Sequence, residues 1–411
     1  MKIFQTSKER LGALAGALRL RAFRILFAFV FAFAVVSPAA VVFAVVWTAP
    51  PVTTGSAAVQ NLEPGRLLPA PDVQPTGLPE PAYNVYANTL SGIVPCPLCE
   101  LPRRVYVPNS MAGTVDVIDP ATFAVVDHYR VGFIPHHIAP AWDMSALYVD
   151  NEGSSSLTVL DIHTGRPAGS VSIPFPYNLY FTPDGTKAVD VVERLQRVEF
   201  RDWRHGWGLL GSVAIPWPGA DHLDFSADGS YFMISTEYSG VVARVDTVNM
   251  RLDGYVRVGG LPIDIKLSPD GKLFYVTNQG RMGVSVVDPV SMSEIQFIPT
   301  GRGAHGLQVS RDTRSLYVSN RLEGSISVID FATRTMTAKW RIPGGGSPDM
   351  LQLNPEGTQL WASGRYNAQV YVFDTRSGQL IERINVGAED HGLTYFPNVG
   401  RYSIGHNGVY R

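Results

Sequence analysis

Histidine and aspartate recur in this sequence at positions that suit a shared binding site. The chain has nine histidines among 411 residues, and five of them fall at two adjacent positions of a repeating unit. Three aspartates hold equivalent positions. These eight residues are His136, His137, Asp221, His222, Asp264, His305, Asp349 and His391. Because imidazole commonly binds zinc and copper, often together with carboxylate, the pattern predicts one polar site built from several repeats.

Four of these residues form the predicted metal set: His136, His305, Asp349 and His391. Three imidazoles and one carboxylate match zinc or copper better than calcium, which prefers oxygen ligands alone. The other four are predicted to form a looser group that lines the same channel. Two further interpretations stay open, namely a polar, water-filled channel and a catalytic histidine that acts as general acid or base. Ordinary surface positions are expected for His128, His163, His205 and His406.

The elements that must position these side chains are short strands. An alternating apolar and polar segment ends in aspartate seven times, at Asp119, Asp161, Asp202, Asp246, Asp288, Asp330 and Asp374. Successive aspartates are 41 to 44 residues apart, and turns such as Pro-Asp-Gly at 183–185 separate the strands. A period of 40–45 residues with four strands per unit is typical of propeller blades. The sequence therefore predicts an all-β fold, a seven-bladed β-propeller over residues 103–411.

Two repeats carry the segments FYVTN (274–278) and LYVSN (316–320), with VSVVD and ISVID downstream. These segments resemble the YVTN-repeat β-propeller family of exported bacterial and archaeal proteins. The resemblance covers roughly residues 103–396, although the units at 177–215 and 221–258 lack the YVTN-type strand. It implies a propeller fold and little about activity, because members include binding proteins, surface-layer components and domains fused to redox centres.

The two ends of the repeat region predict how the ring closes. The first unit has only three strands, within 104–131, and its innermost strand is expected from Gly392–Phe396 near the C-terminus. Pairing of first with last removes exposed sheet edges. The predicted metal set then lies at the mouth of the central channel, on four neighbouring blades. Residues 401–411 are left over once seven blades of four strands have been assigned, and the sequence does not predict where they lie.

The N-terminal region predicts a membrane segment. Residues 1–24 carry six basic side chains against one acid, and residues 25–47 carry no charge. A helix of that length spans roughly 34 Å, enough to cross a bilayer core. The basic flank predicts a single-pass anchor with a cytoplasmic N-terminus and an exported propeller, whereas a cleaved signal peptide would give a secreted protein. Residues 48–102, rich in proline at first, are expected to be a linker.

Cys96 and Cys99 form a Cys-Pro-Leu-Cys segment inside this linker. Residue 100 is Glu rather than His, so covalent haem attachment is excluded. A local disulfide in an oxidising compartment is the preferred interpretation, and a metal-binding or thiol-exchange role is the alternative.

Composition restricts the remaining function classes. The net charge is −2, and no basic run lies outside the N-terminus, so no nucleic-acid partner is expected. The preferred interpretation is a membrane-tethered binding protein that holds zinc, copper or a small ligand in the channel, with a protein partner as a further option on a propeller face. A lactonase- or lyase-like propeller enzyme and a structural cell-surface module are the alternatives. Fold alone does not separate these functions.

Overall fold

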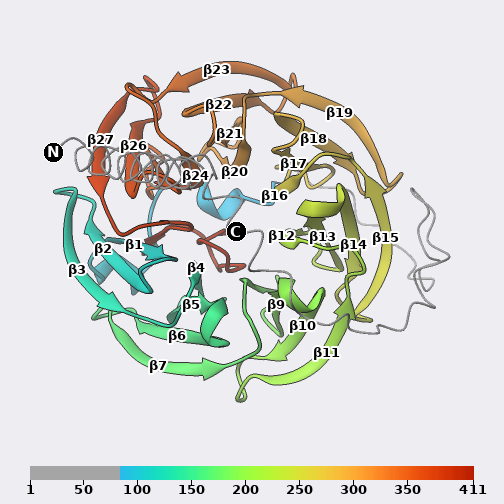
Figure 1. Ribbon diagram of the computed structural model, residues 1–411, viewed down its shortest axis with the longest axis horizontal. Helices are drawn as coiled ribbons and strands as arrows, with labels where there is room; N and C mark the ends of the chain where they lie inside the picture. The colour runs from blue at the N-terminus through green and yellow to red at the C-terminus, as the bar shows by residue number, and fades with distance from the viewer. Residues whose placement is uncertain (1–83) are drawn as a thin grey trace, which may run out of the picture. The chain divides into compact units, whose positions relative to one another are not determined.

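The computed structural model describes residues 84–411, and these residues form a ring of seven four-stranded antiparallel sheets (Figure 1). The predicted seven-bladed β-propeller is confirmed. The predicted basic tail (1–24), the membrane anchor (25–47) and the linker as far as residue 83 lie outside the described residues. Within residues 84–411, no helix has both the length and the apolar character needed to span a bilayer.

Each blade runs from an innermost strand at the channel to an outermost strand at the rim of the ring. Blade 1 consists of β28 (Thr394–Phe396), β1 (Arg104–Asn109), β2 (Thr114–Asp119) and β3 (Ala124–Arg130). Blade 2 consists of β4 (Pro135–Pro140), β5 (Ala146–Asn151), β6 (Ser156–Asp161) and β7 (Pro167–Ser172). Blade 3 consists of β8 (Asn178–Phe181), β9 (Ala188–Val192), β10 (Arg197–Asp202) and β11 (Gly208–Ala214). Blade 4 consists of β12 (Ala220–Phe225), β13 (Tyr231–Thr236), β14 (Val241–Asp246) and β15 (Arg251–Arg257).

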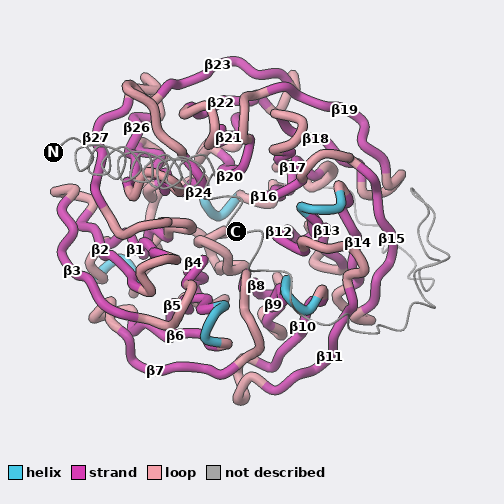
Figure 2. The backbone as a smooth tube through the Cα atoms, in the orientation of Figure 1, coloured by secondary structure: helices cyan, strands magenta, loops and turns pink. Residues whose placement is uncertain are grey.

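The remaining blades repeat this order. Blade 5 consists of β16 (Pro262–Leu267), β17 (Phe274–Asn278), β18 (Gly283–Asp288) and β19 (Ser293–Pro299). Blade 6 consists of β20 (Ala304–Val309), β21 (Ser315–Asn320), β22 (Ser325–Asp330) and β23 (Thr335–Arg341). Blade 7 consists of β24 (Pro348–Leu353), β25 (Gln359–Gly364), β26 (Gln369–Asp374) and β27 (Leu380–Asn385). The described helices are short 3-10 turns (Figure 2), namely η2 (Ala87–Thr89), η3 (Leu98–Glu100), η4 (Glu152–Ser154), η5 (Glu193–Leu195) and η6 (Glu237–Ser239).

The repeated aspartate closes the turn between the third and fourth strands of a blade. In Asp161, Asp330 and Asp374 the carboxylate accepts a backbone N–H three residues further on, each at 2.7 Å. Backbone and hydroxyl donors of these turns hold the pKa of all three carboxyls below the usual range. The residue that defines the sequence period is therefore a turn-forming residue.

A Thr or Ser on the second strand of several blades joins neighbouring blades. The hydroxyl of Thr277 accepts a hydrogen bond from the Asp264 N–H in its own blade and donates to the His305 carbonyl of the next blade. Ser235 and Ser319 make the same contact, at 2.5 Å from the carbonyl oxygens of Ile263 and Asp349. Ser363 does so for His391. Buried backbone groups at the start of the innermost strands are thus satisfied across the blade boundary.

The ring closes as the sequence predicts. Strand β28 pairs antiparallel with β1, and Tyr395 lies opposite Val105. The hydroxyl of Thr394 in turn donates to the Ile138 carbonyl of blade 2, at 2.6 Å. The core lies between successive sheets, where strands such as β1 and β17 are almost fully buried.

Residues 397–411, called the tail below, fold back into the channel, and the C-terminus lies near the centre of the ring (Figure 1). Gly405 of the tail bridges to Tyr180 of β8, and the His406 N–H donates to the Leu179 carbonyl. The Arg411 side chain is 2% exposed and pairs with Asp224 at 2.5 Å. The tail therefore belongs to the interior of the propeller.

The described part of the predicted linker, residues 84–102, packs against the propeller. Val85, Tyr86, Val94 and Leu98 are buried, and the Tyr86 hydroxyl donates to the Leu267 carbonyl at 2.9 Å. The proline-rich composition that suggested a linker lies in residues 48–83, whereas residues 84–102 carry the apolar side chains that make these contacts.

Candidate functional site

The channel wall is built by the first residues of the innermost strands. Strands β4, β12, β16, β20 and β24 place seven of the eight predicted residues there, and His391 precedes β28. All eight are buried, with exposed fractions of 8% or less. We call the end of the channel where these strands begin the upper end.

His305, Asp349 and His391 form one compact cluster, which we call the upper group. One ligand atom from each lies within 4.8 Å of the others. The Asp349 Oδ1 atom lies 2.9 Å from His305 Nδ1 and 3.2 Å from an Arg321 nitrogen. Its Oδ2 atom lies 3.7 Å from His391 Nε2 and has no hydrogen-bond partner within residues 84–411. Three members of the predicted metal set thus come together.

Burial and nearby charges set the protonation states of the residues in the upper group. Burial would raise the pKa of Asp349, but His305 and Arg321 outweigh burial and hold that pKa far below its usual range. Burial lowers the pKa of His305, and burial with the Arg365 charge lowers the pKa of His391. An ionised carboxylate therefore faces two neutral imidazoles.

His136, the fourth residue of the predicted metal set, lies beside this group. Its Nδ1 lies 3.0 Å from His391 Nδ1, and its Nε2 lies 3.0 Å from Glu152. Glu152 is also paired with Arg194, at 2.6 Å. Burial raises the pKa of Glu152, but His136 and Arg194 lower it further than burial raises it. His136 is therefore already held between a carboxylate and a neighbouring imidazole.

A second cluster, the lower group, consists of His137, His222 and His406. One ligand atom of each again lies within 4.8 Å of the other two. The expectation that His406 is a surface group is wrong, because the tail carries it into the channel and its side chain is 1% exposed. His163 and His205 are exposed as expected.

The two other predicted channel residues differ in their surroundings. Asp221 lies 2.7 Å from His222 Nδ1. Asp264 instead binds Lys266 at 2.9 Å and accepts the Leu307 N–H of the next blade at 2.8 Å. Asp264 is therefore occupied by contacts that hold blades 5 and 6 together.

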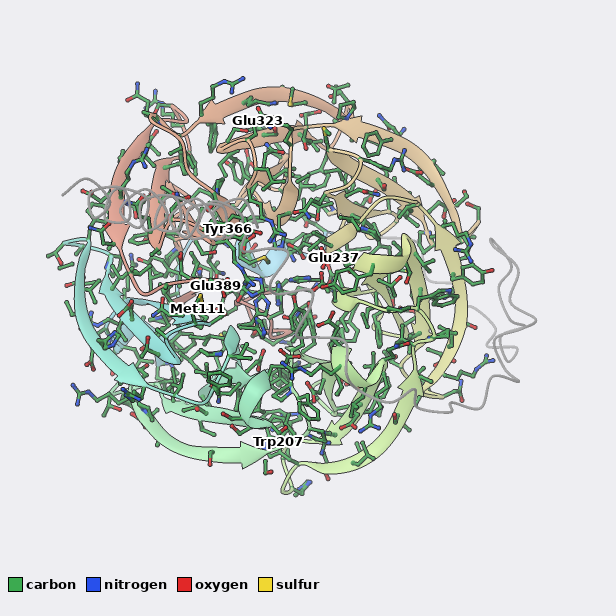
Figure 3. The ribbon with its side chains drawn as sticks, in the orientation of Figure 1. Met111, Trp207, Glu237, Glu323, Tyr366 and Glu389 are labelled. Carbon is green, nitrogen blue, oxygen red and sulfur yellow. A yellow bond between two sulfur atoms is a disulfide. The ribbon has the colours of Figure 1, made fainter. Side chains whose placement is uncertain are left out.

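The rim of the upper end carries charged residues that the sequence analysis did not single out. They directly follow the second strand of their blades: Glu152, Glu193 and Glu237 in blades 2 to 4, and Arg321 and Arg365 in blades 6 and 7. Figure 3 places Glu237, Tyr366, Glu389 and Met111 around the centre of the ring. Burial and the Asp221 charge raise the pKa of Glu237 to about 7. These residues could have been found from the sequence, because each one holds the same position in its repeat.

The lower end of the channel is covered within the described residues. The tail and residues 84–90 pack across it, with the Arg411 guanidinium over the Tyr86 ring and Gln352 donating to the Gly408 carbonyl. They leave a cavity of only about 20 Å³ there. The histidines are therefore closed off from the lower end.

Cys96 and Cys99 are joined by a disulfide, and both residues are exposed. Cys99 lines a surface groove of about 530 Å³ together with Ile93, Arg103 and Glu356. No channel histidine lines this groove.

Solved structures with a similar fold include proteins of different function. The chain has a TM-score of 0.56 and 14% identity to a dihydro-heme d1 dehydrogenase, NirN, over 71% of this chain and 75% of that chain. It has a TM-score of 0.54 and 18% identity to a hydrazine synthase chain of Kuenenia stuttgartiensis, over 62% and 87%. A protein of unknown function from Desulfotomaculum acetoxidans gives a TM-score of 0.62 and 18% identity, over 71% and 98%.

At these identities the similar structures show the fold alone. No curated protein sequence matches the chain. The model of the YNCE-like beta-propeller family matches residues 82–401, which include all seven blades and the predicted site residues. The chain belongs to the YNCE-like beta-propeller family.

Proposed function

We propose that this protein is a binding protein that holds a transition-metal ion, zinc or copper, in the channel of an exported, membrane-tethered propeller. The observation that carries the proposal is the upper group, in which two imidazoles and an ionised carboxylate lie within 4.8 Å. Nitrogen and carboxylate ligands in this combination suit zinc and copper.

The contacts of Asp349 support this role. Its Oδ1 is occupied by His305 and Arg321, but its Oδ2 faces His391 without a partner among residues 84–411. Oδ2 is therefore the oxygen that would bind the ion. Arg321 neutralises the carboxylate when no ion is bound, so the buried charge is never left unpaired.

In this proposal His136 contributes to the same site without contacting the ion. Its ring lies against His391 and is fixed by Glu152. Carboxylate–histidine pairs commonly orient the histidine ligands of metal sites. We therefore assign His136 an orienting role and assign the direct contacts to His305, Asp349 and His391.

Metal binding should be measured on the full chain in detergent by thermal melts with zinc sulfate or copper(II) chloride. A ligand that binds only the folded state at a hundredfold excess over Kd stabilises it by about 2.7 kcal/mol. His305→Ala and His391→Ala should reduce the shift by the part that the upper group contributes, and His163→Ala, a change at an exposed position, should keep it in full. A wild-type midpoint that neither metal moves would contradict the proposal.

The membrane tether is part of the proposal and is tested separately. The uncharged segment 25–47 with its basic flank supports a cytoplasmic N-terminus and an exported propeller. Protease added to intact cells should then digest the propeller and release no cytoplasmic marker. Full protection of the propeller, with digestion after lysis, would place it in the cytoplasm.

One observation favours a catalytic role as the second candidate. Glu152, His136 and His391 form a continuous chain, and a carboxylate-oriented imidazole is a common general base. In that case His136→Gln should abolish turnover of a substrate that binds at the upper end, with metal removal having no effect. Loss of activity on metal removal would favour the metal site.

A further inference from the structure

The lower group lies one residue deeper along the strands than the upper group and has its own surroundings. His137 comes from β4 of blade 2, His222 from β12 of blade 4, and His406 from the tail. Their ring centroids are 4.6 to 5.4 Å apart. No pair of them is joined by a hydrogen bond or an ion pair.

Each of these imidazoles has an oxygen atom at its Nδ1. His137 Nδ1 lies 3.2 Å from Asn407 Oδ1, and His406 Nδ1 lies 2.8 Å from Asn178 Oδ1. His222 Nδ1 lies 2.7 Å from Asp221 Oδ1. For His137 and His406, the oxygen acceptor at Nδ1 fixes the proton there and leaves the other nitrogen as a lone-pair donor. His222 Nδ1 makes no hydrogen bond in spite of the short distance. Burial lowers the pKa of His222, but the Asp221 charge outweighs burial and raises it, so this imidazole must lose a proton to bind an ion.

The remaining ring nitrogens have weak partners or none. Within the described residues, Nε2 of His137 and Nε2 of His222 are buried and have no hydrogen-bond partner. His406 Nε2 has only the Asn407 amide nitrogen, at 3.5 Å. Unpaired buried nitrogens cost free energy. One ring nitrogen of each residue lies within 4.8 Å of the other two, so a single ion between the rings would accept their lone pairs.

We propose that His137, His222 and His406 bind a second transition-metal ion, zinc or copper, each through one ring nitrogen. Three imidazoles with no carboxylate in the cluster match these ions rather than calcium or magnesium. Zinc holds nitrogen ligands at about 2.0–2.1 Å, so binding would bring the three ligand nitrogens, which lie within 4.8 Å of one another here, closer together. A fourth position would remain for water or a small ligand.

The tail is built to deliver His406 to this position. Gly405 has a φ of 90°, and a Cβ there would lie 2.4 Å from the Leu179 carbonyl oxygen, so only glycine permits this approach to β8. Asn407 follows and holds the His137 ring. Arg411 then anchors the tail to Asp224. The ion would therefore tie blades 2 and 4 to the tail.

The experiment uses the full chain in detergent, stripped with a chelator and titrated with cobalt(II) chloride as a spectroscopic probe. Occupation of both groups gives two bound ions per chain, with visible absorption that zinc displaces. His406→Asn keeps a donor toward Asn178 but lacks the second ring nitrogen, and it should bind one ion fewer. His163→Ala is the matched control and should bind as wild type does.

A fold defect is separated from ligand loss by two further measurements. His406→Asn should melt within a few degrees of wild type when both are metal-free. Zinc should slow hydrogen exchange in residues 401–411 of wild type and leave exchange in the variant unchanged.

The outcomes distinguish the two metal proposals. If His406→Asn binds as many cobalt ions as wild type, or if wild type binds none, the lower site is wrong. If His305→Ala and His391→Ala bind as wild type while His406→Asn loses one ion, the lower site stands and the upper site fails.

Discussion

The hydroxyl of Thr277 lies 2.5 Å from the carbonyl oxygen of His305 and donates a hydrogen bond to it across the boundary between blades 5 and 6. The same hydroxyl accepts the Asp264 N–H of its own blade, at 2.9 Å. A small polar side chain on the second strand therefore fixes the backbone of a residue in the upper group.

Thr277→Val should destabilise the protein by about 1–3 kcal/mol, because two buried backbone groups lose their partner while the side-chain volume is kept. Urea unfolding followed by circular dichroism measures this change. Thr337→Val, at an exposed position of β23, is the control: it removes only a long hydrogen bond of 3.3 Å to the Val328 carbonyl and should destabilise the protein clearly less than Thr277→Val does. Equal stability of the two variants would mean that the contact between blades contributes nothing.

Arg411→Met should destabilise the protein by about 3–5 kcal/mol, because it leaves the buried Asp224 carboxylate without its cationic partner. Arg401→Met removes an exposed guanidinium from the same tail and should have little effect. Thermal melts of both variants give the comparison. A tail that contributes only surface coverage would give the two variants the same midpoint.

Deletion of residues 388–411 should cause aggregation, because removal of β28 exposes the edge of β1. Deletion of residues 397–411 keeps β28 and removes only the tail, so it should keep the oligomeric state of wild type with a lowered midpoint. Size-exclusion chromatography separates the two results. A soluble 388–411 deletion that elutes without aggregates and has an unchanged melting temperature would refute ring closure through β28.

Asp150 and Asp190 should make stability fall as pH rises. Burial raises the pKa of both carboxyls, and the Asp190 charge raises the pKa of Asp150 further. A carboxyl with a raised folded-state pKa stabilises the fold below its usual pKa, and this stability is lost as pH rises through the raised value.

Asp190→Asn removes one of these charges, so its stability relative to wild type should increase between about pH 5 and pH 8. Asp161, whose pKa is lowered, is the control. The contribution of Asp161 to the free energy of unfolding is constant over that interval. The stability difference between Asp161→Asn and wild type should therefore not depend on pH. Melts of wild type and both variants across the interval test this prediction. A flat difference for Asp190→Asn would contradict it.

The fold could be predicted because its determinants are local and repeated. Each period supplies the same turn aspartate, and strands of period two fix which side chains face the channel. The strand that closes the ring followed from the missing fourth strand of blade 1. The convergence of His305, Asp349 and His391 follows from the same repeat spacing, because the three residues hold equivalent positions in neighbouring blades.

The tail could not be predicted in this way. Its sequence is rich in glycine and polar residues, and its place depends on contacts with β8, such as the one between His406 and Asn178, 228 residues earlier. Arg321 and Glu152 were missed for a different reason. They follow the strand ends in loops, where repeat position indicates the blade but not the direction of a long side chain.

The covered lower end of the channel has a kinetic consequence. Because the tail and residues 84–90 cover the lower end, an ion on the lower group would have to leave past the upper group. The ring centroid of His391 in the upper group lies 4.5 Å from that of His137 in the lower group. An ion bound to the upper group would then slow the exchange of an ion bound to the lower group. Two ions would load in a fixed order, deep one first, and would be released in the reverse order.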